Sequence, residues 1–233
     1  MNSRSLRTLA TASLVVAGLA FQGGTARAAF SLSASATGSA QAGATYATLD
    51  NLPAAGGTSN GLNVAFNGSG AAVTGSVMSQ YVAPVLAGAN NQFFGPTYTG
   101  TDTTTYASSG TGQTIFTFAN GSQNYLGLLW GSVDTYNSLT FFDASNNVLG
   151  TFTGSDVIAA AGGLGATAAL YVNINSTIAF SRVVASSGSN SFEIDNVAYA
   201  MTAVPEPSSF ALCGIAGLIG ASVARKRARR TVA

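Results

Sequence analysis

The sequence predicts an all-β protein built as one sandwich or barrel, and three observations support this prediction. Short runs of β-branched and aromatic residues alternate with clusters of Gly, Ser, Asn and Asp, at spacings of about 8–12 residues. Helical periodicity is nearly absent, because residues 156–164 form the one helical candidate and Gly162-Gly163 ends it. Strands and helices do not alternate, which argues against a parallel sheet. Residues 29–203 are therefore predicted to form a single β-sandwich domain.

The strands of this domain follow from its apolar and β-branched runs. They are expected at residues 45–51, 62–66, 72–77, 114–119, 125–130, 138–143, 148–152, 170–174, 178–183 and 191–200. The sequence Asp-Ala-Ser-Asn-Asn at 143–147 is typical of a turn that joins two strands of a hairpin. Residues 100–112 are polar and lack an apolar period, so they are expected to form an exposed loop.

Composition excludes several kinds of chemistry. The 233 residues include no His and a single Cys, which removes the commonest general base and any zinc site with several Cys ligands. Lys and Arg gather at the two ends of the chain, and Arg182 is the one basic residue from position 29 to 204. Seven acidic residues share that segment with Arg182, which gives it a net charge of −6. Such a segment has too few cations to neutralise phosphates, so no nucleic-acid partner is expected.

Residues 1–28 have the three parts of a secretory signal peptide. Arg4 and Arg7 precede an apolar run at 8–21, and the small residues Ala26 and Ala28 then frame a cleavage site before Ala29. The apolar run is shorter than a membrane-spanning helix requires. The alternative is a buried helix at the start of a cytosolic domain. We expect export, with signal peptidase as the processing partner.

Residues 204–233 predict a second membrane-directed segment. The Pro residues of Val204-Pro205-Glu206-Pro207 end any preceding strand, and residues 208–224 then carry no charge. As a transmembrane helix, 208–224 would be about 25 Å long, which is short but sufficient to span. The basic cluster that follows comprises Arg225, Lys226, Arg227, Arg229 and Arg230. The positive-inside rule keeps this stop-transfer cluster in the cytoplasm, which places the acidic domain across the membrane.

This C-terminal order of elements resembles the PEP-CTERM sorting signal of Gram-negative bacteria that make exopolysaccharide. The resemblance lies in the Pro-Glu-Pro triplet, the short apolar helix and the Arg-rich tail at 225–230. It implies recognition by an exosortase, which cleaves near the triplet and releases or transfers the protein to the cell surface. It also implies that the membrane anchor is transient. The alternative from the residues alone is a simple tail anchor.

Two further resemblances concern the domain itself. Residues 192–197, Phe-Glu-Ile-Asp-Asn-Val, resemble the closing strand of secreted bacterial jelly-roll modules, and residues 49–53 resemble the opening strand. The resemblance implies a jelly-roll-like β-sandwich. Alternation predicts that Glu193, Asp195 and Val197 share one face of the closing strand. Residues 124–142, with Trp-Gly-Ser-Val-Asp-Thr-Tyr-Asn, resemble a cyanobacterial and proteobacterial group of exosortase-dependent surface proteins, which implies a surface location and a shared fold.

Three candidate sites follow from the acids and aromatics. Calcium takes oxygen ligands, and Asp50 and Asp195 would meet if the opening and closing strands lie side by side. Trp130 and Tyr136 could stack on a sugar whose hydroxyls bind Asp134 and Asn137, unless Trp130 packs in the core. A glycan hydrolase would need a pair of acids across a cleft, and the pairs available are Asp134 with Asp143 and Glu193 with Asp195. Strand-end Asp residues are more often turn formers, so no catalytic residue is assigned.

The sequence thus predicts an exported, non-enzymatic protein of the cell surface or the extracellular matrix. The alternative is a carbohydrate-binding module that attaches the cell to its exopolysaccharide, and a glycan hydrolase is the third hypothesis. No cofactor is expected apart from the calcium ion considered above.

Overall fold

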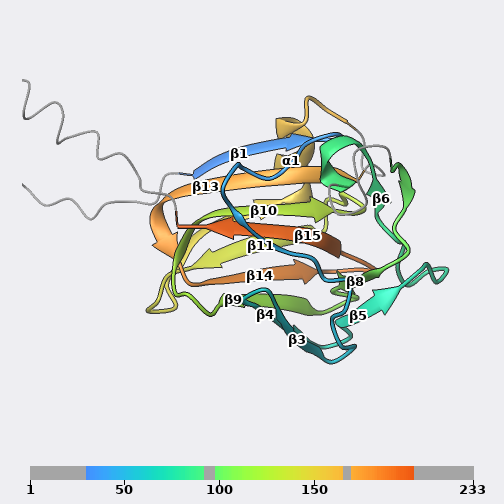
Figure 1. Cartoon of the computed structure of the whole chain (residues 1–233), viewed down its shortest axis with the longest axis horizontal. Coiled ribbons are helices and arrows are strands. Elements are labelled where there is room, and N and C mark those ends of the chain that lie inside the picture. The colour runs from blue at the N-terminus through green and yellow to red at the C-terminus, as the bar shows by residue number, and fades with distance from the viewer. Residues whose placement is uncertain (1–29, 92–97, 165–168, 202–233) are drawn as a thin grey trace, which may run out of the picture.

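The computed structural model describes residues 30–91, 98–164 and 169–201, which form two antiparallel sheets packed face to face (Figure 1). The predicted signal peptide and the predicted sorting segment lie outside the described residues. The all-β class is confirmed, with a sandwich-like arrangement of the two sheets.

The seven-stranded sheet has the order β1-β13-β10-β15-β8-β5, and β2 pairs with β15 outside this path. Its strands are β1 (Phe30–Ser35), β2 (Thr45–Ala47), β5 (Ala71–Thr74), β8 (Thr105–Ser108), β10 (Gln123–Trp130), β13 (Leu170–Phe180) and β15 (Glu193–Ala200).

The six-stranded sheet has the order β12-β11-β14-β9-β4-β3. Its strands are β3 (Gly56–Ser59), β4 (Leu62–Asn67), β9 (Gln113–Phe118), β11 (Asn137–Phe142), β12 (Val148–Thr153) and β14 (Arg182–Ser187). A small ribbon pairs β6 (Val85–Leu86) with β7 (Gly100–Thr101), and the helical elements are η1 (Gly88–Asn91) and α1 (Gly154–Ala160).

Most predicted strands match observed ones, and the differences have physical reasons. The predicted exposed loop at 100–112 is wrong, because it contains β7 and β8 and because Tyr106 and Ala107 are fully buried. The predicted strand at 178–183 is divided between the end of β13 and the start of β14. The hairpin turn at 143–147 is confirmed, since the carboxylate of Asp143 accepts hydrogen bonds from the backbone N–H groups of Ser145 and Asn147, both at 2.8 Å.

The main core lies between the two sheets. Side chains of β9 and β11 alternate between buried and half-buried, as expected for strands with one face in the core. Phe141 and Phe180 make an edge-on contact at 5.0 Å between ring centroids, and the ring of Trp130 stacks on Phe192 at 4.1 Å. The apolar residues that alternate along these strands therefore form this core.

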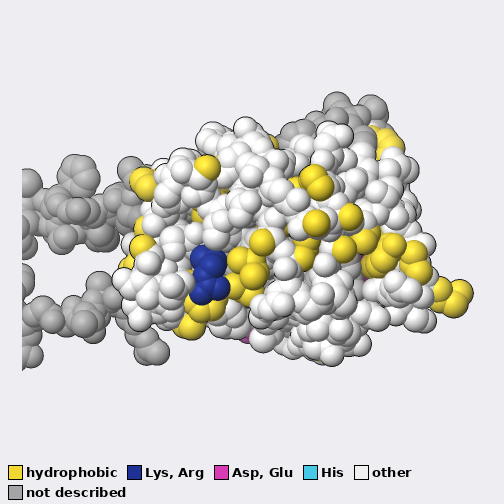
Figure 2. Space-filling model, turned by 90° about the horizontal axis from the view of Figure 1, so that it is seen from below, with side chains coloured by type: hydrophobic (Ala, Val, Ile, Leu, Met, Phe, Trp, Pro, Cys, Tyr) yellow, Lys and Arg dark blue, Asp and Glu magenta, His cyan; other side chains and the backbone are white. Residues whose placement is uncertain are grey.

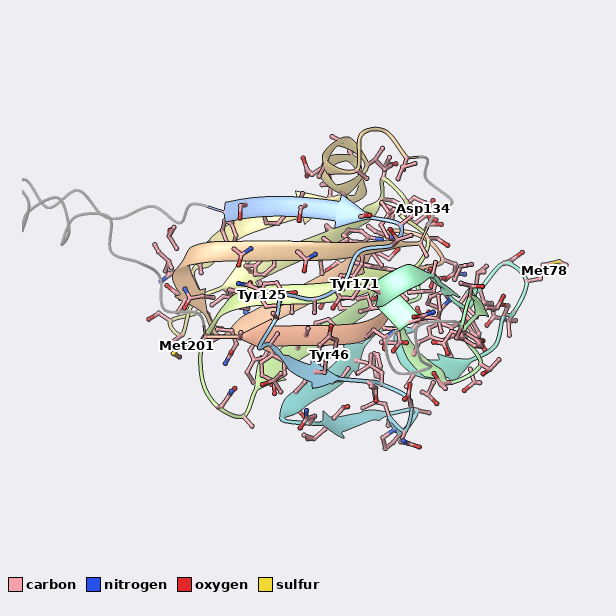
Figure 3. All side chains as sticks on the ribbon, turned by 45° about the horizontal axis from the view of Figure 1, so that its top comes forward. Tyr46, Met78, Tyr125, Asp134, Tyr171 and Met201 are labelled. Atoms are coloured by element: carbon pink, nitrogen blue, oxygen red, sulfur yellow. The ribbon has the colours of Figure 1, made fainter. Side chains whose placement is uncertain are left out.

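The seven-stranded sheet is also covered on its outer face. Every residue of β10 is buried, so this strand has no solvent-exposed side. Outside the main core, Leu129 and Tyr171 form a second apolar cluster with Leu86 of β6. Figure 3 labels Tyr46, Tyr125 and Tyr171 on this sheet. The segment that contains β6 and η1 lies against the outer face, and we call it the covering layer. It creates a second buried environment, and polar side chains of the sheet face it.

The described chain starts and ends on the same side of the sandwich. In Figure 1, β1 begins and β15 ends at the left, beside the thin grey traces. Figure 3 shows Met201 on that side, whereas Met78 and Asp134 lie at the opposite end. The loops at the Met78 end are therefore remote from the points where the chain enters and leaves the sandwich. Among the described residues, no helix is long and apolar enough to cross a membrane.

Candidate functional site

A β-bulge in β15 determines which side chains face the covering layer. Leu129 of β10 is opposite Asp195 and Gly127 is opposite Ala198, so β15 contains one more residue than its partner between these positions. Asn196 takes up the extra length with a φ of 47°. As a result Ile194 and Val197 both lie in the main core. The expectation that Val197 shares a face with Glu193 and Asp195 is wrong, because the bulge shifts the alternation.

The bulge places a carboxyl group in a closed environment. Asp195 is fully buried, and neither of its side-chain oxygens has a hydrogen-bond partner among the described residues. Burial raises the pKa of Asp195 well above its ordinary value, and the Asp102 carboxyl, close enough to share a hydrogen bond, raises it further. We call Asp102 and Asp195 the bulge carboxyls. They form a pair of buried acids that lies outside the main core.

Only one of the two carboxyl oxygens of Asp102 accepts hydrogen bonds from its own loop. One oxygen, Oδ1, accepts hydrogen bonds from the backbone N–H and the hydroxyl of Thr104, both at 2.7 Å. The other, Oδ2, is buried and has no partner within the described part of the chain. Sequence reasoning missed this residue because it placed residues 100–112 in solvent. Asp102 is 1% exposed, so its burial is as complete as that of a core residue.

Asp50 lies near Asp195, although not through the strand pairing that the sequence suggested. β2, which ends just before residues 49–53, pairs with β15, whereas Asp50 itself lies in a turn. Asp50 is close enough to raise the pKa of Asp195, but its effect ranks below that of Asp102. Within residues 30–91, 98–164 and 169–201, no three His, Cys, Asp or Glu side chains form one group able to hold a metal ion. The acidic part of the cluster is therefore the pair Asp102 and Asp195.

Amide side chains complete the surroundings of the bulge. The Asn196 side chain donates from Nδ2 to the backbone carbonyl of Asn90 in η1 at 2.8 Å. Its Oδ1 atom is buried without a partner in the described residues, and the same holds for both polar side-chain atoms of Asn91. The hydroxyl of Tyr171 donates to the carbonyl of Asn196 at 3.0 Å. The bulge therefore gathers several polar atoms whose hydrogen-bonding capacity is unused.

Glu193 lies two residues before Asp195, and in contrast to Asp195 both of its carboxyl oxygens accept hydrogen bonds. Its Oε1 accepts hydrogen bonds from the backbone N–H of Val82 at 3.1 Å and from the hydroxyl of Ser191 at 2.8 Å. Its Oε2 accepts a third, from the backbone N–H of Ser132 at 3.4 Å. A buried carboxylate with several donors is stabilised as a charge. Glu193 thus joins three loops at the Met78 end of the sandwich.

These loops surround a groove, which we call the end groove. A hollow of about 240 Å³ is lined by Asp134, Glu193 and residues 79–82, and it adjoins a second hollow of about 540 Å³. Gln80, Tyr81 and Asn190 line both hollows. The Asn190 side chain donates to the carbonyl of Ser79 at 2.9 Å, which ties the two sides of the groove together. Polar and apolar side chains both line the groove, and the half-buried Tyr81 supplies an aromatic ring to it.

Of the four residues considered for sugar binding, two are buried and two are accessible. Trp130 is 0% exposed and stacks on Phe192, so its ring packs in the core, which was the alternative to stacking on a sugar. Asn137 is also buried, and its amide donates to the carbonyls of Ser132 and Ser191. Asp134 lines the end groove, whereas Tyr136 is 42% exposed beside it.

Tyr136 is held in place by its hydroxyl. This group donates to Asp134 Oδ2 at 2.9 Å and lies 3.1 Å from the carbonyl of Asn190. Partial burial and the bond to Asp134 raise the pKa of Tyr136 to about 12, so the phenol stays protonated at neutral pH. Asp134 and Tyr136 therefore form one polar unit beside the groove.

Neither predicted pair of acids spans an open cleft. Asp134 and Asp143 lie beyond opposite ends of β11, a strand that is itself about 20 Å long. The Asp143 carboxylate is occupied by its own hairpin, and these hydrogen bonds lower its pKa. Glu193 and Asp195 share one face of β15, but Asp195 is sealed from solvent. The pair that does meet at a solvent-accessible hollow is Asp134 with Glu193.

The chain matches no described protein family, no curated protein and no solved structure.

Proposed function

We propose that the chain is an exported, non-enzymatic protein of a Gram-negative cell surface or extracellular matrix, processed by an exosortase. The observation that carries this proposal is the order of elements in residues 204–233. The triplet Pro205-Glu206-Pro207, the uncharged stretch 208–224 and the basic cluster follow one another as a sorting signal requires. The three-part leader at 1–28 supports the proposal, because a protein on this route must first be exported.

Features of the described domain are consistent with this route. Arg182 is its single basic residue and gives the one dark blue patch in Figure 2, so the exported part would carry a strong negative charge while both membrane-directed ends are cationic. The described chain starts and ends on one side of the sandwich (Figure 1), and Asp134, which lines the end groove, lies at the opposite end (Figure 3). The antiparallel pairing of β2 with β15 supports a jelly-roll-like topology for the domain.

Processing of the two ends tests the proposal. The full chain, with an epitope added after Ala233, is expressed in cells that contain or lack an exosortase. We expect the epitope to be lost in the first cells alone, and the mature N-terminus to be Ala29 by mass spectrometry. Replacement of Pro205, Glu206 and Pro207 by Ala should preserve the epitope, whereas replacement of Ser208 and Ser209 by Ala should not. Recovery of the full chain from the cytosol, with its leader attached, would contradict the proposal.

Carbohydrate binding in the end groove is a second candidate function, and the lining of the groove favours it. Sugars are bound by an aromatic ring beside polar groups that exchange hydrogen bonds with hydroxyls. Tyr81 supplies the ring, while Asp134 and the amides of Gln80 and Asn190 supply the polar groups. This arrangement replaces the site around Trp130 that the sequence suggested.

A glycan array probed with the processed protein tests this second function. We expect Tyr81→Ala to abolish binding and Asp134→Asn to weaken it. Val148→Ala is the matched control, because Val148 is 61% exposed on β12 and does not line the groove. An array on which Tyr81→Ala binds as the unchanged protein does would remove the end groove from consideration.

A further inference from the structure

We propose that the bulge carboxyls bind a divalent cation, Ca²⁺, with Asp195, Asp102 and the side-chain oxygen of Asn196 as its ligands. The site lies between β15 and the layer that covers the seven-stranded sheet. It is separate from the end groove, and it does not depend on the route by which the protein is exported.

The first step of the argument is charge. Two carboxyl groups are buried next to each other, and a buried charge is costly unless an opposite charge compensates it. Arg182 is the one basic side chain in the described part of the chain. It lies over the ring of Phe142 at 3.8 Å and donates to Asn146, so it is engaged on the other sheet. The protein side chains described therefore supply no cation to the bulge carboxyls, and a bound ion would.

The second step is the supply of oxygen atoms. Both oxygens of Asp195, Oδ2 of Asp102 and Oδ1 of Asn196 are buried, and none has a hydrogen-bond partner from the described residues. Buried polar atoms without partners are rare in native proteins, because each one costs free energy. Four such oxygens on three residues at one bulge indicate a missing electropositive partner.

The third step is direction. Ile194 and Val197, on either side of the bulge, both point into the main core. Asp195 is fully buried beside Asp102 and close to Tyr171, which belongs to the second apolar cluster, so its side chain faces the covering layer. Asn196 also bonds the carbonyl of Asn90, which places the end of η1 against this face. The next residue, Asn91, is fully buried with an unpartnered side-chain oxygen among the described atoms, and it is the candidate for a further ligand.

The chemistry of these donors selects the ion. Ca²⁺ takes six to eight oxygen ligands from carboxylates, amides and carbonyls in flexible geometry, whereas Zn²⁺ favours His and Cys. The chain has no His. Mg²⁺ requires a nearly ideal octahedron and keeps several waters, which suits a closed pocket poorly. Two carboxylates would balance the charge of one Ca²⁺ ion.

Thermal unfolding of the purified full-length chain, stripped with chelator, tests the site. Addition of Ca²⁺ to about 100 times its dissociation constant should raise the unfolding midpoint by about 5–10 °C, and the same concentration of Mg²⁺ should raise it much less. Asp195→Asn and Asp102→Asn should each weaken Ca²⁺ binding by at least about tenfold, since each removes one of two charged ligands. Asp143→Asn is the matched control, because Asp143 belongs to an exposed hairpin and should leave the Ca²⁺ response unchanged.

Terbium luminescence gives a second, local readout. Tb³⁺ replaces Ca²⁺ and emits when a nearby tyrosine is excited, and the Tyr171 hydroxyl donates to the carbonyl of Asn196. We expect sensitised emission that Ca²⁺ competes away and that Asp195→Asn or Asp102→Asn abolishes. Two variants are used so that a folding defect in one leaves the other informative. A midpoint that does not respond to Ca²⁺, or a response retained in both variants, overturns the proposal.

Discussion

Glu193 and Asp195 are two residues apart on one strand, face the same layer and are both buried, yet their surroundings differ completely. Glu193 accepts three hydrogen bonds from three loops, whereas neither side-chain oxygen of Asp195 has a donor among the described residues. The neighbours of the two carboxyl groups explain the difference, because Glu193 reaches hydrogen-bond donors from three loops whereas Asp195 lies beside the carboxyl group of Asp102. Burial alone therefore does not reveal what a carboxyl group does. Its donors indicate whether the charge joins loops together or still requires a partner.

The largest effect in this comparison is expected at Glu193. Glu193→Ala removes the acceptor for the N–H groups of Val82 and Ser132 and for the hydroxyl of Ser191. Buried donors without acceptors are costly, so we expect a loss of about 3 kcal/mol in the free energy of unfolding, measured with urea. Tyr136→Phe is the control, since it removes a hydroxyl at the partly exposed rim. A loss below about 1 kcal/mol would show that Glu193 does not join the loops.

Asp195 should respond in the opposite direction when no cation is bound. Asp195→Asn removes a carboxyl group whose charged form is disfavoured by burial and by Asp102, as its raised pKa indicates, while the shape of the side chain is kept. In chelator we therefore expect the free energy of unfolding to be unchanged or raised, because a buried uncompensated charge is unfavourable. Glu193→Gln under the same conditions should be destabilised. Equal destabilisation of the two variants would contradict the proposed difference between Glu193 and Asp195.

Asn196 provides a smaller test, directed at the bulge itself. Its φ of 47° is unfavourable for residues other than Gly and, to a lesser degree, Asn and Asp. Asn196→Gly loses the hydrogen bond to Asn90, whereas Asn196→Ala loses the bond and adds backbone strain. We expect the Ala variant to be less stable than the Gly variant by about 1 kcal/mol in urea denaturation. Equal stabilities would mean that the bulge rearranges without cost.

The smallest effect is expected at an acid on the surface. Asp156 is part of a capping box at the start of α1, where it accepts hydrogen bonds from the backbone N–H and hydroxyl of Thr153, and these bonds lower its pKa. A lowered pKa in the folded state stabilises the protein above the ordinary value of 3.8, and this contribution is lost as the pH falls through the folded pKa. The unchanged protein should thus be slightly more stable than Asp156→Asn near pH 7. The difference should disappear below pH 3.8, and a constant difference would exclude the carboxylate as its source.

The strands that alternation predicted best are those with one face in the main core, such as β9 and β11. Strand β8 escaped prediction because it is rich in Thr and Ser, and polar strands resemble loops in composition. In the folded protein these hydroxyls bond one another, as Ser108 does with Ser191 at 2.8 Å and Ser109 with Thr114 at 3.0 Å. The first of these pairs joins residues 83 positions apart, so the sequence alone does not show that its hydroxyls are satisfied.

The candidate sites were predictable only where they depend on strand pairing. Asp195 was identified, and its approach to Asp50 was expected, although Asp50 lies in a turn after β2 and not in a strand paired with β15. Asp102 was missed because the covering layer, not its local sequence, buries it. For Trp130 the sequence left both a core position and a sugar-binding position open, because its place at a strand end before a polar loop does not show which way the ring turns. The one local signal of the bulge was Asn196, a residue type that tolerates positive φ.

The first described strand begins and the last one ends on the same side of the sandwich. An attachment through Met201 would therefore hold the domain by that side. β15 is about 26 Å long, so the end groove would stand at least that far above the attachment point. Coupling the protein to a sensor chip through its C-terminal side would reproduce this orientation and keep the groove open to large polymers. Coupling through a residue inserted near Met78 would bring the groove against the chip and should suppress their access.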